Sequence, residues 1–483
     1  MRSFVYPSGR LLTLAAVLVC LTSAPCLLHA DPGQHPLIQT IGSKADTHQV
    51  YVYWPKADTI RLRVDAQALQ TSRQSPGKRG WRISLPKLSD GLHHLYITFL
   101  QNGSVLRKRR LDFSTKGRRV LFKRTYLWLS RFDLVAGITR ANVSSQSVYN
   151  NLVKKNIRSY LHKAKVAGIS DILFQVRGQG DVLYRSRLEP FSHLLNPDAK
   201  LGLDPGWDPL QYAVDCCRAL DLRLHCWFNT LPVYRSGALS YKQNVYGKPL
   251  PVDRLRQCLA VNREGVLKQK NGYLFLHPAH PQTRTYIKQL LAEIIDHYPC
   301  HGIHFDYIRM VDREHLYNPH VEADFRMVKG SQSYDAYLTR KLNVLVHSLY
   351  LFAKQRNPEL VLSAATLPSL NGSGYSARRF YQSPATWINQ RYLDLVFPMT
   401  YEPRRLPGYL QEYLDEIASS RRNCIVPGIG LYLTLPEEGN MPVSPFLRAM
   451  DTVAGNDALG GMAIFSGQAF VQHFNAIYKK LNE

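Results

Sequence analysis

The stretch Gly302–Met310 sets a carboxylate and a guanidinium into an apolar run, and it is the part of the sequence best suited to chemistry. Side chains in a strand alternate between faces, so His304, Asp306 and Ile308 are expected on one face and Ile303, Phe305 and Tyr307 on the other. A carboxylate buried at a strand end costs several kcal/mol in desolvation unless it is paired or opens onto a pocket. Two interpretations stay open: Asp306 is catalytic, or it forms a structural ion pair with Arg309.

Other polar and aromatic residues lie at the ends of further predicted strands. They are Arg177 and Asp181 after the second strand, Trp227 and Asn229 on the third, His304, Asp306 and Arg309 on the fourth, and Tyr401 and Glu402 after the sixth. Aromatic rings stack on the C–H faces of sugar rings, amide and basic side chains bind hydroxyls, and two carboxyl groups flank the bond in most glycosidases. If these residues converge on one face, they are typical of a sugar site.

The elements needed to bring these residues together are those of a barrel. From Arg124 onward, apolar strand patterns alternate with helical periodicity over about 360 residues, which fits a (β/α)8 TIM barrel. We predict eight strands, over Tyr126–Phe132, Asp171–Arg177, Leu222–Asn229, Gly302–Tyr307, Leu360–Thr366, Leu393–Thr400, Cys424–Leu431 and Gly461–Ser466. Helices are predicted over Ser147–Val166, Pro209–Leu220, Pro281–Tyr298, Tyr334–Gln355 and Leu406–Ser420, with a last one from Gln468.

Long loops are expected after the third and fourth strands, over Pro232–Tyr273 and Val311–Ser333. Both follow the C-terminal ends of strands, which is the side of a barrel on which active sites are built. The predicted barrel occupies residues 122–483.

Residues 35–118 predict a small all-β sandwich of immunoglobulin or fibronectin type that precedes the barrel. Its predicted strands are His48–Trp54, Thr59–Val64, Trp81–Leu85, His93–Leu100 and Ser104–Phe113. Aromatic residues in this part could form a sugar platform, although core packing is the more common use. They are Tyr51, Tyr53, Trp54 and Trp81.

Residues 1–30 are typical of a secretory signal peptide, with Arg2 and Arg10 before an apolar stretch and Ala30 at the expected cleavage site. We therefore expect export to the periplasm or cell envelope and no transmembrane segment in the mature chain. The six cysteines beyond residue 30 lack metal-ligand spacing, so no metal and no cofactor is predicted.

The net charge is +25, and loss of Arg2 and Arg10 with the signal leaves +23. Such a charge favours anionic partners, which for an exported protein means anionic envelope polymers. The densest basic run is Arg107–Arg110, continued by further lysines and arginines up to Arg124. A nucleic-acid-binding function is disfavoured because the export signal is present and no nucleic-acid-binding motif is found.

Several of these segments, in the same order, closely resemble the bacterial glycosyl-hydrolase-like family 10 proteins. The segments are Phe174–Arg177, Gly180–Tyr184, Leu188–Pro190, His225–Asn229, Gly302–Arg309 and Phe397–Tyr401, and the resemblance extends over about residues 122–466. It implies a TIM-barrel glycoside hydrolase of the cell envelope, with some relatives acting on peptidoglycan glycan strands. It also implies that Asp306 is the first catalytic candidate and adds Gln175 to the substrate-binding residues Arg177, Trp227, Asn229, His304, Arg309 and Tyr401.

A more distant likeness, to family 18 chitinases, fails at an informative position. Those enzymes have two Asp and then a Glu, spaced two residues apart, at the end of the fourth strand, and here the corresponding residues are His304, Asp306 and Ile308. Because Ile308 replaces the acid, the chitinase mechanism cannot be carried over. A proton donor would have to be found elsewhere.

The leading hypothesis is a glycoside hydrolase that uses Asp306 as nucleophile or base and Glu402 or Asp181 as the acid. A nucleophile needs a lowered pKa, so Arg309 would have to outweigh the effect of burial. Carboxyl separations of about 5–5.5 Å or about 6.5–9.5 Å would distinguish retaining from inverting hydrolysis. The alternative is a non-catalytic glycan-binding or scaffolding protein that keeps a hydrolase-like barrel.

Overall fold

The computed structural model describes the chain from residue 37 to residue 482 with gaps. The described ranges are 37–44, 47–53, 59–65, 67–69, 72–73, 80–85, 91–116, 119–122, 124–139, 143–235, 243–245, 247–265, 273–372 and 374–482. The predicted signal peptide and Trp54 therefore lie outside the described residues.

Two antiparallel sheets form the N-terminal part of the chain. One has the strand order β1 (Leu37–Lys44), β2 (Thr47–Tyr53), β6 (Gly80–Leu85) and β5 (Ser72–Arg73). The other has the order β4 (Gln67–Leu69), β3 (Thr59–Val64), β7 (Gly91–Gln101), β8 (Ser104–Lys116) and β9 (Arg119–Phe122). Strand β3 alternates exposed and buried residues, as the sequence predicts. Trp81 is buried in the core between the sheets, together with Ile97 and Phe99.

Eight parallel strands form a single sheet in the C-terminal part of the chain, which confirms the predicted barrel. Its order is β19 (Leu395–Pro398), β18 (Val361–Thr366), β17 (Gly302–Asp306), β13 (Arg223–Asn229), β11 (Asp171–Arg177), β10 (Arg124–Leu129), β21 (Gly461–Ile464) and β20 (Gly428–Ile429). A parallel bridge between Val396 and Ile425, with a 2.9 Å bond from the Val426 N–H to the Val396 carbonyl, joins the two edge strands. The sheet is therefore nearly closed.

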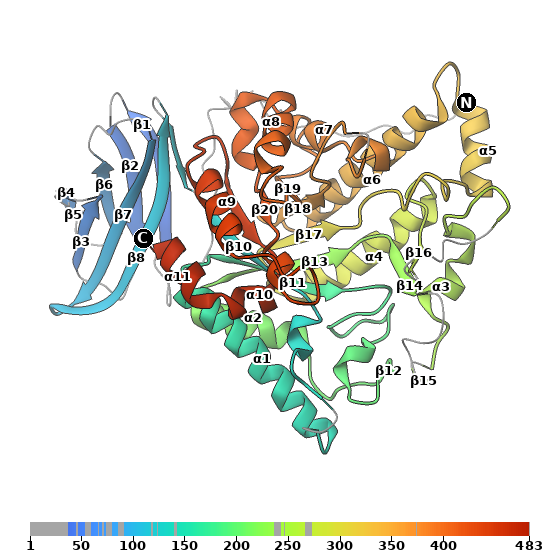
Figure 1. Cartoon of the computed structure of the whole chain (residues 1–483), viewed down its shortest axis with the longest axis horizontal. Coiled ribbons are helices and arrows are strands. Elements are labelled where there is room, and N and C mark those ends of the chain that lie inside the picture. The colour runs from blue at the N-terminus through green and yellow to red at the C-terminus, as the bar shows by residue number, and fades with distance from the viewer. Residues whose placement is uncertain are drawn as a thin grey trace, which may run out of the picture.

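Helices cover the outside of this barrel (Figure 1). They are α1 (Gln146–Val166), α2 (Pro209–Leu220), α4 (Pro281–His297), α6 (Tyr334–Arg356), α7 (Pro384–Asn389), α8 (Leu406–Glu416), α9 (Ser444–Ala454), α10 (Gly467–Gln472) and α11 (Phe474–Asn482). Helix α2 begins where the sequence predicts because Asp208 accepts a hydrogen bond from the Gln211 N–H and Pro209 occupies the first turn. None of the helices in the described part of the chain has the length and apolar composition that a membrane span requires.

The strands divide their side chains between two cores. Ile303 and Phe305 of β17 pack in the outer core against the helices, whereas His304 faces the barrel interior, where the indole N–H of Trp128 donates to its Nε2 atom over 3.1 Å. The predicted alternation is thus confirmed from Ile303 to Asp306. It is wrong beyond the strand end, because Ile308 packs in the same outer core as Ile303 and Phe305. Burial lowers the pKa of His304 well below its usual value, so this residue is a neutral part of the interior.

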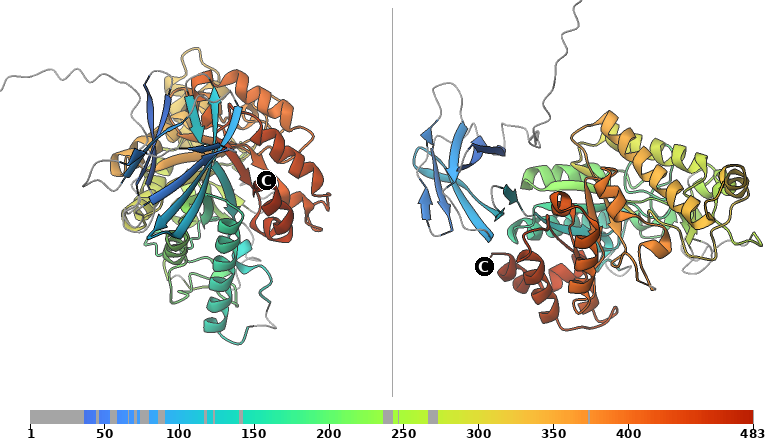
Figure 2. Two further views of the ribbon diagram at one scale, coloured as in Figure 1. Left: turned by 90° about the vertical axis from the view of Figure 1, so that its left-hand side faces the viewer. Right: turned by 90° about the horizontal axis from the view of Figure 1, so that it is seen from above.

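Insertions after the third and fourth barrel strands extend one end of the molecule. They contain β14 (Pro232–Arg235), β15 (Gln243–Asn244), α3 (Pro251–Arg254), β16 (Tyr273–Phe275) and α5 (Pro319–Val328), while β12 (Lys200–Leu201) pairs with β15. In Figure 1 these elements lie on the right and the sandwich lies on the left, and Figure 2 shows the same separation from above. The sandwich adjoins the end at which β10 begins, so the loops that follow the strands are on the opposite side.

Candidate active site

Asp306 ends strand β17 and lies beside Asn229, its register partner at the end of β13. Its carboxylate accepts hydrogen bonds from the backbone N–H of Tyr307, over 2.6 Å, and from the indole N–H of Trp227, over 3.2 Å. The Arg309 Nη1 atom is 3.5 Å from the Oδ1 atom of Asp306. The side chain of Asp306 is about 10% exposed, so this acid is almost buried at the mouth of the barrel, where the three contacts above fix its position.

The balance of burial and charge at Asp306 shifts its ionisation toward the protonated form. Burial raises the pKa of Asp306, and the opposing effects of Arg309, the Tyr307 N–H and the Trp227 indole do not cancel it. The outcome is a raised pKa. A carboxyl group with a raised pKa suits proton donation better than nucleophilic attack, which requires the charged form.

The backbone after Asp306 turns sharply at Tyr307, which has a left-handed φ of 50°. This conformation is uncommon for a bulky residue and is found where surrounding contacts enforce it. Here the Arg309 guanidinium lies 4.4 Å from the centroid of the Tyr307 ring and donates from Nη2 to the hydroxyl of Tyr375 over 3.1 Å. The turn therefore brings Arg309 back toward Asp306.

An aromatic cluster stands next to this acid. The ring of Tyr401 is stacked on that of Phe465, with centroids 5.5 Å apart, and the ring of Tyr432 is 5.4 Å from that of Tyr401. Gly430 permits this arrangement because a Cβ atom there would be 2.4 Å from the Cβ of Tyr401. Burial and then the charge of Asp306 raise the pKa of Tyr401 well above its usual value.

Asn229, the register partner of Asp306, has a polar side-chain atom without a hydrogen-bond partner among the described residues. The residue is only 7% exposed, and this atom, Oδ1, is itself buried. A buried amide oxygen without a partner is costly and is commonly found where a ligand supplies the missing donor. A sugar hydroxyl would be such a donor.

Arg177, by contrast, faces away from the barrel interior. A register irregularity between Gln175 and Arg177 sets Arg177 opposite Phe228, a residue of the outer core, and the guanidinium lies 5.1 Å from the centroid of the Phe228 ring. Two hydrogen bonds, of 2.6 and 2.8 Å, join it to the carboxylate of Glu189, and another joins it to the Asn229 carbonyl. Through its hydrogen bond to the Asn229 carbonyl, Arg177 helps to fix the position of the end of β13.

Asp181 is likewise engaged by neighbouring residues. It is 1% exposed, and its Oδ1 atom accepts from Arg131 Nη1 and from the Gln179 N–H, both over 2.8 Å. Burial alone would raise the pKa of Asp181, but Arg131 holds that pKa well below its usual value. Gln175 belongs to the same group, since its Oε1 atom accepts from the Arg131 N–H over 3.0 Å.

Glu402 lies at the surface beyond Tyr401. Its side chain is 57% exposed and its Oε2 atom is 3.2 Å from Arg405 Nε. Burial is the largest cause of the raised pKa of Tyr432, and the charges of Glu438 and then Glu402 add to it. Of the two carboxyl groups proposed beside Asp306, Glu402 is the one open to solvent.

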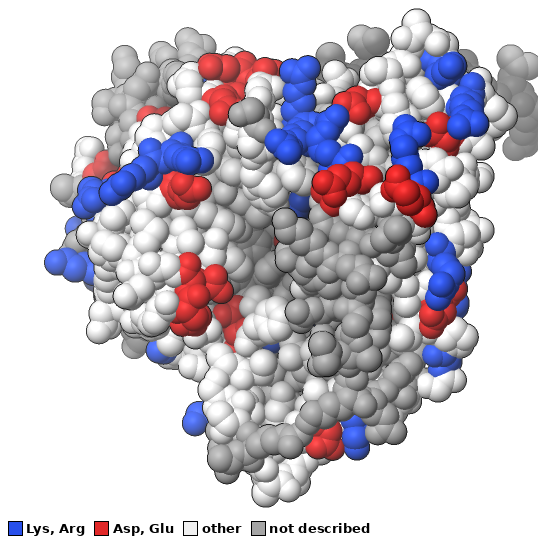
Figure 3. Space-filling model, turned by 45° about the vertical axis from the view of Figure 1, so that its right-hand side comes forward, with Lys and Arg blue, Asp and Glu red and all other residues white. Residues whose placement is uncertain are grey.

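The sequence did not identify several residues that shape this site. Tyr375 lies in a connection without a recognisable motif, and Arg131 falls at the end of the predicted strand Tyr126–Phe132 but was not singled out. Their contacts join positions 66 and 50 residues apart. Phe465 could have been recognised, because it falls in the last part of a predicted barrel strand, where side chains reach the catalytic end. Figure 3 shows the molecule from the side that carries the loops, and this face is hollowed near its middle.

A parallel barrel with a buried acid, an amide and aromatic rings at its strand C-termini is the arrangement found in glycoside hydrolase barrels. The sequence matches the family described as Glycosyl hydrolase-like 10 over residues 135–438. Because this match covers more than half of the chain, the protein belongs to that family, as the resemblance predicts.

Individual relatives agree with this assignment. The chain is 27% identical over 333 residues to glycosyl hydrolase DigH of Escherichia coli (strain K12), a match that covers 63% of this chain and 72% of that protein. It is 26% identical over 157 residues to glycosyl hydrolase YngK of Bacillus subtilis (strain 168), covering 32% and 28% of the two chains. The solved glycoside hydrolase domain of PgaB (BpsB) from Bordetella bronchiseptica has a TM-score of 0.51 at 12% identity, covering 74% of this chain and 99% of that domain.

Proposed function

We propose that this protein is an exported glycoside hydrolase that cleaves the glycan strands of a cell-envelope polysaccharide, most specifically those of peptidoglycan. The family and the barrel support a glycosidase-like function. The observation that carries the proposal is the buried Asp306 with its raised pKa, set between the Trp227 indole and Arg309. Such an acid can protonate the oxygen of the leaving sugar.

In this proposal Asp306 donates the proton and Glu402 is the second carboxyl group, acting as base or nucleophile. The raised pKa of Asp306 supports its role, and the exposure of Glu402 leaves it accessible to a substrate or a water molecule. Asn229 binds a sugar hydroxyl through its unpartnered Oδ1 atom, while Trp227 and Tyr401 form apolar sugar contacts. Arg177, His304 and Asp181 position the strand ends.

Export is part of the proposal and rests on the sequence. Residues 1–30 have the pattern of a signal peptide, which would deliver the chain to the periplasm or cell envelope. Peptidoglycan is then the glycan that the enzyme meets there, and the net charge of +25 favours anionic envelope polymers as partners.

The test is Asp306→Asn, assayed on purified peptidoglycan glycans with the products identified by mass spectrometry. We expect a loss of at least ~10³ in rate, about 4 kcal/mol of transition-state stabilisation, with glycan binding retained. Asp296→Asn, at a side chain 42% exposed on α4, is the matched control and should keep the parental rate. Parental activity in Asp306→Asn would contradict the assignment.

The same variant also has an expected effect on stability. Because the pKa of Asp306 is raised in the folded state, the acid contributes stability below its usual value of 3.8, and this contribution is lost as pH rises through the raised pKa. Asparagine resembles the protonated acid, so Asp306→Asn should unfold at a temperature at least equal to that of the parent at pH 7. A variant that fails to fold would instead indicate a structural ion pair with Arg309.

A non-catalytic glycan-binding protein is the second candidate function. It is favoured by one observation: Ile308 is fully buried where the related chitinases have their acid. Under this alternative, the parent protein would release no cleavage product from the glycan. Asp306→Asn would then change only the affinity for the glycan.

A further inference from the structure

Tyr375 combines high exposure with a contact to the buried part of the candidate site. The residue is 54% exposed and belongs to the connection from β18 to α7. Its hydroxyl accepts a hydrogen bond from Arg309 Nη2 over 3.1 Å, and Arg309, only 8% exposed, lies next to Asp306. A tyrosine this exposed adds little to the core, so its contact with a buried arginine calls for another explanation.

The ion pair of Asp306 with Arg309 is long and has a single contact. Arg309 Nη1 is 3.5 Å from Asp306 Oδ1, while the other carboxylate oxygen accepts from the Trp227 indole. Arg177 and Glu189, a second buried pair that follows a barrel strand, are joined by two hydrogen bonds of 2.6 and 2.8 Å. An arginine fork matches a carboxylate in this paired way. Other contacts must therefore keep Arg309 from closing on Asp306.

Two tyrosines hold the guanidinium of Arg309. The Tyr375 hydroxyl lies closer to Nη2, at 3.1 Å, than the carboxylate of Asp306 lies to Nη1, at 3.5 Å. The centroid of the Tyr307 ring is 4.4 Å from the guanidinium carbon, and that of the Tyr375 ring is 6.0 Å away. Cation–π attraction to these rings adds to the hydrogen bond. The two tyrosines thus compete with Asp306 for the same charge.

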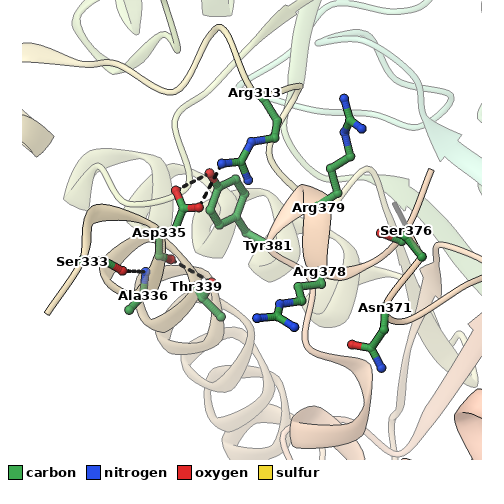
Figure 4. A pocket seen from close by; sticks show the side chains of 11 residues that line it. Arg313, Ser333, Asp335, Ala336, Thr339, Asn371, Ser376, Arg378, Arg379 and Tyr381 are labelled. Atoms are coloured by element: carbon green, nitrogen blue, oxygen red, sulfur yellow. Dashed lines mark hydrogen bonds and ion pairs between the residues drawn. The ribbon is translucent and has the colours of Figure 1, made fainter. Parts of the chain in front are cut away.

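The connection that carries Tyr375 is fixed near both of its ends. Near its start, the carboxylate of Glu412 on α8 accepts from the Leu370 N–H over 2.6 Å. Near its end, the Tyr381 hydroxyl donates to Asp335 at the start of α6 over 2.8 Å (Figure 4). Contacts with two helices therefore hold the segment against which Arg309 is placed.

Arg309 is the charge that acts most strongly on Asp306. Burial raises the pKa of Asp306, and Arg309 has the largest opposing effect. Burial and then the charge of Asp306 raise the pKa of Tyr307 to about 12 and that of Tyr401 well above its usual value, so both hydroxyls are neutral at neutral pH. The neighbouring strand ends add no titratable group, because β13 contributes an indole and an amide beside Asp306 and β18 ends in Ala–Ala–Thr. The position of Arg309 therefore controls the ionisation of Asp306.

We propose that Tyr375 is a positioning residue that holds the guanidinium of Arg309 away from the carboxyl group of Asp306. The inference deepens the proposed function and rests on it, because it concerns the acid that would donate the proton. With the Tyr375 hydroxyl in place, Arg309 keeps a single long contact and Asp306 retains its proton more readily. Without that hydroxyl, the guanidinium is free to form a shorter and stronger contact with the carboxylate.

The test compares Tyr375→Phe with Arg309→Gln and with the variant that carries both changes, in the full chain. Because Tyr375 is 54% exposed and its ring is kept, Tyr375→Phe should unfold at the parental temperature. The ionisation of Asp306 is followed through Trp227, whose indole N–H donates to it over 3.2 Å. The indole N–H signals of the 6 tryptophans are recorded by NMR as pH is varied. Trp227→Phe assigns the Trp227 signal, and Asp306→Asn should abolish its titration.

We expect the midpoint of the Trp227 titration to fall by at least ~0.5 pH in Tyr375→Phe, because Arg309 comes closer, and to rise in Arg309→Gln. The double variant should follow Arg309→Gln, since Tyr375 acts only through the guanidinium. For Tyr375→Phe, kcat/KM on a glycan should fall at least ~3-fold on the alkaline limb, which is the same shift expressed as a rate. The matched control Tyr212→Phe, on α2, removes a hydroxyl that accepts from Arg158 over 2.8 Å and should change neither quantity.

A midpoint that is unchanged or raised in Tyr375→Phe would overturn the positioning role, as would a fall from Arg309→Gln to the double variant. A Trp227 signal that does not move with pH in the parent would also overturn it, because Asp306 would then have no ionisation for Tyr375 to control. If the midpoints shift as expected but the parent cleaves no glycan, the proposed hydrolase function fails while the positioning role stands. If glycan is cleaved and Tyr375→Phe leaves the midpoint unchanged, the hydrolase function stands and this inference fails.

Discussion

At the residue scale, the chemistry depends on how two opposing effects balance at Asp306. The sequence shows an acid three residues before an arginine, and from that spacing alone Arg309 could have kept the acid ionised. In the structure the two groups are 3.5 Å apart, a long contact, and burial has the larger influence. We therefore propose that Asp306 is a proton donor, in place of the nucleophile or base of the leading hypothesis.

Arg309→Gln tests this balance through pH dependence. Removing the positive charge removes an effect that lowers the pKa of Asp306, so that pKa should rise further. If Asp306 is the proton donor, the alkaline limb of the kcat/KM profile should move to higher pH.

The control for this profile is Arg326→Gln, at a side chain 73% exposed on α5, which should move neither limb. An upward shift of the acidic limb in Arg309→Gln would instead make Asp306 the base or nucleophile. If neither limb moves, Asp306 is not the group whose ionisation limits the reaction.

At the scale of elements, the periodicity of apolar residues and the helix-capping residues were sufficient to predict most of the strands and helices. The sequence located every barrel strand and set the bounds of α2, because apolar alternation and an Asp–Pro start are local signals. Predicted strand Cys424–Leu431 is reduced to Gly428–Ile429, since Cys424 ends one 3-10 helix, Leu431 begins another, and Ile425 forms a single bridge. Helix α9 was not predicted.

The orientation and the partners of several site residues could not be predicted from the sequence, because they depend on strand register and tertiary packing. Arg177 was predicted to bind substrate because of its place at the end of the second strand and the family resemblance, but the irregularity in β11 turns it to the outer core. The partners of Asp181 and Asp306 are distant in sequence, so their ion pairing and burial follow only from tertiary packing. Asn229 beside Asp306 was predictable, because both close neighbouring parallel strands.

Glu189→Gln tests the positioning role of Arg177. Both side chains of this pair are 0% exposed, so loss of the Glu189 charge leaves a buried guanidinium uncompensated. We expect the free energy of unfolding in urea to fall by about 3–5 kcal/mol. Asp296→Asn, which removes a pair with Arg356 that is 38% and 42% exposed, should cost less than about 1 kcal/mol. Equal costs would show that Arg177 is not held as a buried charge.

At the scale of the whole molecule, the sandwich and the loops that follow the barrel strands lie at opposite sides of the barrel (Figure 1). The basic run Arg107–Arg110 belongs to β8, and of its side chains only that of Lys108 is among the described residues. Register pairs Lys108 with Thr98 and Arg61 with the same threonine on the neighbouring strand β3. Basic positions of two strands thus share one face of the five-stranded sheet.

The face of the five-stranded sheet that carries these basic positions points away from the core of the sandwich. Ile97 and Phe99 of β7 are buried in that core, so Tyr96 and Thr98 between them lie on the other face. Arg61 and Arg63 are exposed, and the Arg63 guanidinium is 4.3 Å from the centroid of the Tyr96 ring. We therefore expect anionic envelope polymers to bind at this face, away from the site of cleavage.

Neutralising Arg61, Arg63 and Lys108 by glutamine should weaken cosedimentation with anionic cell-wall polymer at about 0.05 M salt and flatten its decline toward about 0.3 M, because such attraction is screened by ions. Cleavage of a short soluble glycan should be unchanged, since the sandwich does not adjoin the catalytic loops. The control replaces three exposed basic residues of α1 and α2, namely Lys155, Arg158 and Arg218, and alters the net charge equally. If both triple variants lose binding to the same extent, total charge attracts the polymer, and the sandwich face has no special part in it. If the sandwich variant loses turnover of the short glycan, the two ends of the molecule are coupled, and attachment and catalysis cannot be separate functions of separate domains.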